Sequence, residues 1–107
     1  MIVPADQSAQ SSPASPHVAT AYFSERLRHL MAGMGVRDLD NGQVRRLTPL
    51  RLQRMLQAQA PELPLSQSQF YRYVNGEATP DIAVVYELAI LFGVPPTYFI
   101  PDRYLPE

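Results

Sequence analysis

Cysteine is absent from this 107-residue sequence, which excludes disulfide bonds and thiolate metal sites. Only two histidines occur, His17 and His29, and they are too few for a histidine-rich metal site. No run of ~18 apolar residues is present, so no transmembrane helix is expected. The first residues also lack the basic and apolar regions of a signal peptide. We therefore expect a cytoplasmic protein with no metal, cofactor, small-molecule ligand or membrane contact.

Lysine is also absent, so every basic residue is an arginine. Arginine suits bidentate contacts to phosphates and base edges, although a genomic composition bias explains the same count. The formal net charge is only −1, but the charges are unevenly distributed. Residues 20–76 carry eight arginines and four acidic residues, whereas residues 77–107 carry one arginine and five acidic residues. Such an asymmetry can make one face of a nearly neutral protein positive.

The length and the 46% hydrophobic content indicate one domain with a single modest core. Residues 1–16 are rich in Ser, Pro, Ala and Gln and show no apolar periodicity. That composition is typical of a disordered or loosely attached tail. We expect residues 17–107 to form the folded domain.

Apolar residues recur at helical spacing in four segments that are bounded by residues typical of helix ends. The predicted helices cover residues 17–32, 49–59, 66–74 and 80–92. N-caps are expected at Ser15, Thr48 and Ser66, and Asn75-Gly76 and Gly93 supply stops. Pro95-Pro96 then opens a short fifth helix with Tyr98, Phe99 and Ile100. The aromatic residues Tyr86, Phe92, Tyr98 and Phe99 could line a ligand pocket, but core packing is their expected role. The sequence therefore predicts an all-α fold of five helices.

Residues 33–46 form an extended connection between the first two predicted helices. Asp40-Asn41-Gly42 stands between the dipeptides VR and QV and could make a small hairpin. A calcium loop does not fit, because the glycine stands one place early and Pro49 occupies the twelfth position, where a glutamate is needed.

The stretch LSQSQFYRYVNGEATP, from Leu65 to Pro80, combines a short polar helix with an abrupt stop. If Phe70, Tyr73 and Val74 face the core, helical spacing places the polar side chains on or near the other side. Those side chains are Gln67, Ser68, Tyr71 and Arg72, with Gln69 at the boundary. Glutamine can pair with adenine, arginine with guanine and serine with several bases, so this helix suits a DNA major groove.

The run LSQSQFYRYVNG-EATP-DIAVVYELAILFGVPPTYF resembles the lambda repressor/Cro-like (XRE) helix-turn-helix domain. The resemblance covers about residues 20–100 and is strongest over 65–99. Two features differ from compact members: Pro49 replaces a phosphate-contacting glutamine, and the AQAPELP link is several residues longer. The longer layout is similar to the mycobacterial EspR group of regulators.

The resemblance implies a sequence-specific transcriptional regulator that binds double-stranded DNA. The resemblance places Gln67, Ser68 and Tyr71 at base-facing positions. It implies that Arg72 contacts a base or a phosphate and that Asn75 hydrogen-bonds a backbone phosphate at the end of the helix. Ser66 begins the recognition helix, and Thr48 heads the supporting helix. For Arg45, Arg46, Arg51 and Arg54, a solvated surface and a phosphate contact by one or two of them are both open, and the candidate phosphate contacts are Arg45, Arg46 and Arg51.

Two other function classes compete with this interpretation. The near-neutral charge and the acidic C-terminal third also suit a helix-turn-helix that holds another protein in a transcription complex. An enzyme is not expected, because Ser24, Glu25 and His29 lack the oriented base and third group that a nucleophile needs. For a DNA-binding regulator we expect nucleoid association and a homodimer, with Tyr98 to Leu105 or the N-terminal segment as candidate interfaces.

Overall fold

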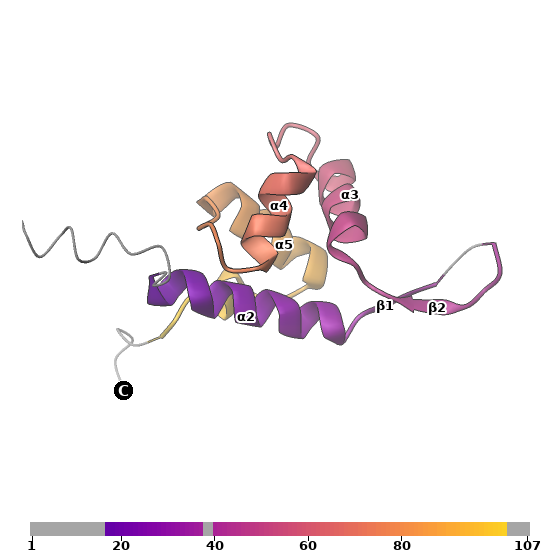
Figure 1. The fold of residues 1–107 in the computed structure, drawn as a ribbon, viewed down its shortest axis with the longest axis horizontal. Coiled ribbons are helices and arrows are strands. Elements are labelled where there is room, and N and C mark those ends of the chain that lie inside the picture. Colours follow the sequence, from indigo (N-terminus) through magenta and orange to yellow (C-terminus); the bar gives the residue numbers. More distant parts are fainter. Residues whose placement is uncertain (1–16, 38–39, 103–107) are drawn as a thin grey trace, which may run out of the picture.

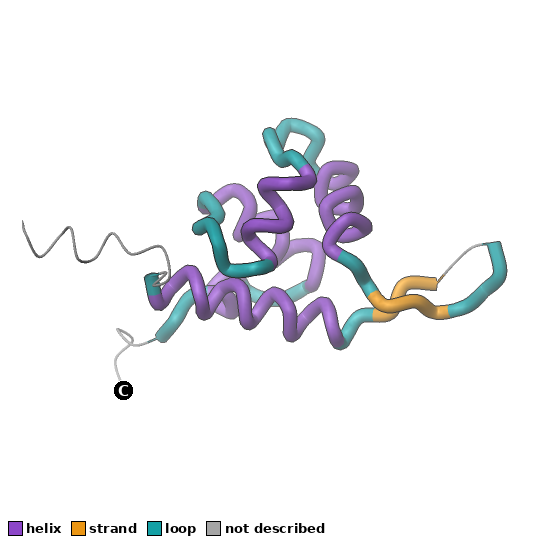
Figure 2. Tube along the Cα trace, in the orientation of Figure 1, coloured by secondary structure: helices purple, strands orange, loops and turns teal. Residues whose placement is uncertain are grey.

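Four α-helices, a single 3₁₀ turn and a two-stranded sheet make up the described chain (Figures 1 and 2). The computed structural model describes residues 17–37 and 40–102, so the tail predicted at 1–16 lies outside the described residues. In chain order the elements are α2 (Val18–Ala32), β1 (Gly35–Arg37), β2 (Val44–Arg46), α3 (Pro49–Gln59), α4 (Gln67–Val74), α5 (Ile82–Phe92) and the 3₁₀ turn η1 (Pro96–Phe99).

The four predicted α-helices are confirmed, each within two residues of its expected ends. Thr48 and Ser66 cap α3 and α4 as expected, because their side chains accept hydrogen bonds from backbone N–H groups of the first turn. The cap of α2 is His17, where Ser15 was expected: its Nδ1 accepts a hydrogen bond from the N–H of Ala19 at 2.9 Å. Asp81 caps α5 in the same manner, so α5 begins two residues later than predicted.

The expectation of five helices in an all-α fold is wrong for the described residues. The fifth segment, Pro96–Phe99, is a 3₁₀ turn. Pro95 and Pro96 carry no N–H and Pro101 follows soon after, so the segment is too short for an α-helical ladder. The other difference is the two-stranded sheet, which lies in the connection between the first two helices.

The hairpin that Asp40-Asn41-Gly42 suggested is present and projects from the helical body (Figure 1). Its strands are antiparallel, and Gly35 pairs with Arg46, Val36 with Arg45 and Arg37 with Val44. A Cβ at Gly35 would collide with a methyl group of Val44, so a larger residue there requires that exposed side chain to move. The hairpin adds little to the core, since nearly all of its described side chains are exposed.

One hydrophobic core joins the helices. Its fully buried large side chains come from α2, the connection to α3, α3, α4, α5 and η1, and they include Leu27, Leu47, Leu52, Leu56, Phe70, Leu88 and Phe99. At the edge of the core, the guanidinium of Arg26 stacks 3.8 Å from the ring centroid of Tyr98 and donates to its carbonyl oxygen at 3.0 Å. Arg26 therefore attaches η1 to α2, and it is a structural residue.

Tyr86 departs from the expected pattern. The sequence placed it with Phe92, Tyr98 and Phe99 as a core aromatic, but its side chain is 56% exposed. Phe99 is buried, and Phe92 and Tyr98 pack partly against the core. The periodicity of α5 did not reveal this, because apolar residues occur on all sides of that helix.

Candidate nucleic-acid interface

The helix α4 turns its apolar side chains to the core and its polar ones to solvent. Phe70, Tyr73 and Val74 are buried, Phe70 completely. The opposite surface, which we call the α4 face, is exposed and consists of Gln67, Ser68, Tyr71, Arg72 and Asn75. Gln69 is half-buried at the boundary, as helical spacing predicted. One surface therefore presents amide, hydroxyl and guanidinium groups, which are the groups that hydrogen-bond base edges and phosphates.

The link between α3 and α4, residues 60–66, is held by two glutamines of α3. Gln53, which is only 7% exposed, donates from Nε2 to the carbonyl oxygen of Leu65 at 2.8 Å. Gln57 donates from Nε2 to the carbonyl oxygen of Leu63 at 2.7 Å. The side chains of Leu63 and Leu65 are themselves buried in the core. Because Leu65 stands one residue before the N-cap of α4, these bonds determine where α4 begins relative to α3.

The Gln53→Leu variant is expected to lose about 1–3 kcal/mol of unfolding free energy. Leucine keeps most of the volume but leaves the carbonyl oxygen of Leu65 without its buried donor. Thermal or urea denaturation measures the loss, and Gln43→Leu, the same change at an exposed position outside the core, is the matched control. Equal stability of the two variants would show that Gln53 does not hold the link.

The C-terminus of α4 is closed by a Schellman motif. The N–H of Gly76 bonds to the carbonyl oxygen of Tyr73 at 3.3 Å, and the N–H of Glu77 bonds to that of Arg72 at 2.8 Å. Gly76 adopts the left-handed conformation that the motif requires, with φ 76°. The exposed Asn75 is the last residue before this reversal, so its side chain lies at the end of the α4 face.

Two side chains of α2 hold the same end of α4. Ser24 Oγ donates to the carbonyl oxygen of Val74 at 2.7 Å, and Arg28 donates to the same oxygen at 2.7 Å. Arg28 also bonds to Ser24 Oγ. A guanidinium at this position compensates the partial negative charge of the helix C-terminus. The α4 face is therefore positioned at one end by α3 and at the other by α2.

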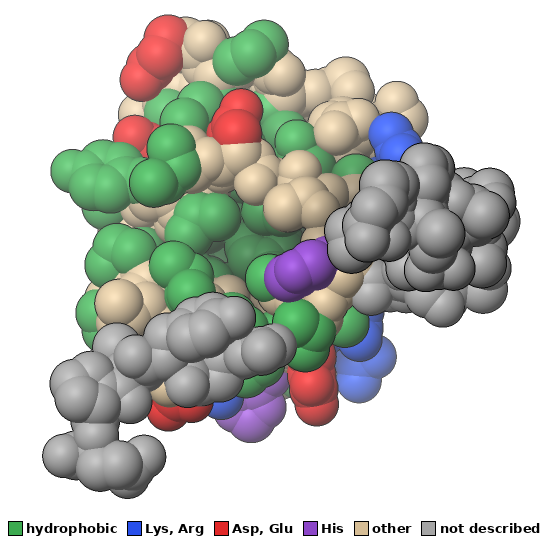
Figure 3. All heavy atoms as spheres, turned by 90° about the vertical axis from the view of Figure 1, so that its left-hand side faces the viewer, with side chains coloured by type: hydrophobic (Ala, Val, Ile, Leu, Met, Phe, Trp, Pro, Cys, Tyr) green, Lys and Arg blue, Asp and Glu red, His purple; other side chains and the backbone are tan. Residues whose placement is uncertain are grey.

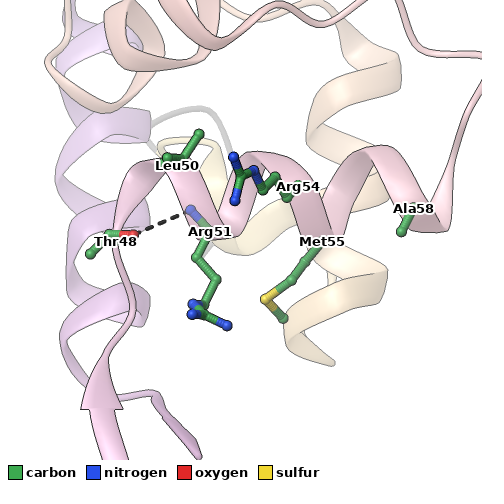
Figure 4. A pocket seen from close by; sticks show the side chains of 6 residues that line it. All are labelled: Thr48, Leu50, Arg51, Arg54, Met55 and Ala58. Carbon is green, nitrogen blue, oxygen red and sulfur yellow. Dashed lines mark hydrogen bonds between the residues drawn. The ribbon is translucent and has the colours of Figure 1, made fainter. Parts of the chain in front are cut away.

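The N-terminus of α3 is the second surface that the sequence singled out. Thr48 caps it, accepting from the N–H of Arg51 at 3.2 Å, while Pro49 has no N–H to offer a phosphate. Arg51 and Arg54 are both exposed and line a shallow hollow of about 360 Å³ on α3 (Figure 4). This part of α3 therefore presents two guanidinium groups where Pro49 contributes no donor.

Arg45 and Arg46 lie on opposite faces of the hairpin, because neighbouring residues of a strand alternate. Arg46 shares its face with Arg37 and Gly35. It also borders a hollow of about 290 Å³ together with Arg28, Pro49 and Val74, at the end of α4. The two arginines therefore project to different sides of the hairpin, and Arg46 is the one that lies beside the end of α4.

Sequence reasoning did not select two arginines that the structure places on these surfaces. Arg54 lies with Arg51 on α3, and its spacing of three residues from Arg51 was the available signal. Arg37 is exposed on β1 and donates to the carbonyl oxygen of Gly42 at 2.8 Å. The side of the hairpin on which Arg37 lies depends on how β1 pairs with β2, which the sequence alone does not give.

Comparisons with protein-family models and with curated proteins give no match. Among solved structures, the chain is similar to a solution structure of the SOS-response transcriptional repressor LexA from Eubacterium rectale. The TM-score is 0.59 at 22% sequence identity, and the match covers 86% of this chain and 79% of that chain. This likeness shows the fold alone, a helix-turn-helix fold. The finer resemblance to the XRE family and to the EspR group stays a prediction.

The described residues contain no cluster of three His, Cys, Asp or Glu side chains that could hold a metal ion. Across the same part of the chain, the helices are too short or too polar to span a bilayer.

Proposed function

We propose that this protein is a sequence-specific DNA-binding transcriptional regulator that reads the major groove with the α4 face. The observation that carries the proposal is the division of α4, whose apolar side is anchored in the core while its exposed side carries only hydrogen-bonding groups. A helix supported from behind by a preceding helix is how helix-turn-helix proteins present side chains to base edges. The helix-turn-helix fold, and the similarity of that fold to a protein named as a transcriptional repressor, support the proposal.

The roles follow from position along α4. Gln67, Ser68 and Tyr71 contact base edges, since they occupy the first two turns of the helix, which enter the groove. Arg72 contacts a base or a phosphate, and Asn75, at the end of the helix, contacts a phosphate. Ser66 positions the helix, because its hydroxyl accepts from the N–H of Gln69 at 3.1 Å.

Phosphate contacts on the other side of the groove come from α3 and the hairpin. Arg51 and Arg54 supply the charge at the N-terminal half of α3, where Pro49 provides no donor. Arg46 adds a third guanidinium beside α4. Thr48 keeps α3 capped, and Arg45 faces the opposite side of the hairpin. We further propose that the protein acts in the cytoplasm, on the nucleoid, as a homodimer.

Selection of bound duplexes from a random DNA pool at two salt concentrations tests this function. An enriched motif whose binding falls steeply with salt is expected, because arginines on phosphates release counterions. Failure to enrich any sequence at low salt would contradict the proposal. Salt-insensitive capture of a protein partner without DNA binding would instead favour the use of this fold as a protein-interaction module, which the acidic C-terminal third also suits.

The Gln67→Ala variant is expected to relax the preference at one base position of the selected motif, at a cost of about 1–3 kcal/mol against the preferred base. Its binding to unrelated duplexes should stay unchanged, because phosphate contacts carry no sequence information. Repeating the selection with the variant measures this. An unchanged motif would remove Gln67 from the base-reading set.

A further inference from the structure

The outward face of α5 carries a line of exposed apolar side chains that has no partner among the described residues. Ile82, Tyr86 and Ile90 are 84%, 56% and 52% exposed and stand four residues apart. We call this line the α5 stripe. An exposed helix face in a water-soluble domain is normally polar, and a helix that is apolar all round is normally buried. The α5 stripe therefore indicates a surface that a binding partner covers when the protein is functional.

The stripe is free of charge. The remaining exposed side chain on this face within the helix is Ala83. Glu87 lies at its edge, where its carboxylate accepts from Gln59 Nε2 at 2.7 Å and so turns toward α3. The other side of α5 is occupied, because Val84 and Leu88 are buried in the core. The stripe is thus a separate surface and not the margin of the core.

DNA does not fit this surface. Residues 77–102 contain four acidic residues and no basic one. Figure 3 looks onto the side of the molecule where α5 begins, and there hydrophobic side chains cover much of the surface, acidic side chains lie among them and basic ones are few. A polyanion would be repelled from such a face, so its partner is a protein.

A second copy of this chain fits the stripe by symmetry. When two α5 helices pack antiparallel, Tyr86 meets its counterpart at the two-fold axis and Ile82 meets Ile90 of the partner subunit. Every contact is then apolar against apolar, and the two helix dipoles oppose each other. An isologous contact of this kind needs only the one surface that is present.

The size of the stripe determines when the contact forms. Three partly exposed side chains supply only about half of the ~800 Å² per partner that a stable interface buries. Two free copies therefore associate weakly, whereas DNA that holds two copies side by side raises their effective concentration. We propose that the α5 stripe pairs two copies of this chain on adjacent half-sites of DNA, an inference that rests on the proposed function.

The first test compares a duplex recovered by selection with the same duplex carrying one scrambled half-site. The Ile82→Glu variant is expected to bind the intact duplex at least ~10-fold more weakly than the wild type, because each pair then buries carboxylates in place of isoleucines. On the scrambled duplex the two proteins should bind equally. Val18→Glu, which changes an apolar side chain that is 50% exposed on α2, is the matched control.

Equal binding of Ile82→Glu and the wild type to the intact duplex would overturn the inference. So would a loss of thermal stability of the free Ile82→Glu protein beyond that of Val18→Glu, because the stripe would then be covered within a single molecule.

A second test compares the free protein with the protein on the selected duplex, and it uses the absence of cysteine. Tyr86→Cys is expected to form a disulfide-linked dimer in concentrated solution, faster than Glu25→Cys, which lies on an exposed position of α2. If the protein binds no duplex but Tyr86→Cys still dimerises preferentially, the DNA-binding function fails and the homotypic contact stands. If the protein binds DNA and the two cysteine variants crosslink equally slowly with and without duplex, the homotypic contact fails alone.

Discussion

The Phe70→Ala variant is expected to lose about 3–5 kcal/mol of unfolding free energy, because the side chain is completely buried and its surroundings fill the resulting cavity only in part. Domains of this size have total unfolding free energies of about 5–15 kcal/mol, so the variant loses a large part of its stability. Phe70 packs edge-on against Tyr73, with ring centroids 6.4 Å apart, and that contact is lost as well. Circular dichroism during heating or urea unfolding measures the effect.

Tyr71→Ala is the matched control, because it removes an aromatic side chain from the neighbouring position of the same helix. Tyr71 is 42% exposed on the α4 face, so its loss should leave the stability nearly unchanged while DNA binding weakens. Comparing Phe70→Ala with Tyr71→Ala thus distinguishes the contribution of the buried side of α4 to stability from that of its exposed side to DNA binding. Equal destabilisation by both variants would mean that α4 is not divided in this way.

The Arg72→Ala variant is expected to weaken binding to the selected duplex by about 1–3 kcal/mol, roughly 5- to 150-fold. The mode of contact is readable from the salt dependence. A phosphate contact predicts weaker binding to all duplexes and a salt slope smaller by about one. A base contact predicts a relaxed preference at one position. Titration of the selected and scrambled duplexes at several salt concentrations distinguishes these modes.

Arg26→Ala is the control for charge alone. Its guanidinium stacks on Tyr98 and is committed to the fold, so its removal should lower thermal stability and leave DNA binding little changed. If both arginine variants weakened binding equally, Arg72 would act only through net charge, and its assignment to the α4 face contact would fail.

Much of the fold was predictable because its signals are local. N-caps such as Thr48 and Ser66 are recognisable from side-chain chemistry, since a short hydroxyl can reach the N–H groups of the first turn. The stop at Asn75-Gly76 is equally local, because only a residue tolerant of positive φ can close a Schellman motif. The polar and buried sides of α4 followed from helical spacing in the same way.

The fifth helix and Tyr86 were misread for a different reason. In both cases a local apolar pattern was compatible with more than one environment. The prolines around η1 limited its length. For α5, which is apolar on every side, the pattern alone could not tell a core side chain from one left at the surface.

The sequence by itself determined the four helices, the caps of α3 and α4 and the division of α4, because these depend on contacts within a few residues. Only the tertiary structure decided how the long link is held, which hairpin face carries Arg46, and that the α5 stripe is exposed. The hydrogen bond from Gln53 to the carbonyl oxygen of Leu65 joins residues 12 positions apart. The hydrogen bond from Arg28 to the carbonyl oxygen of Val74 joins residues 46 positions apart. Such pairings arise when the helices pack, so no local pattern contains them.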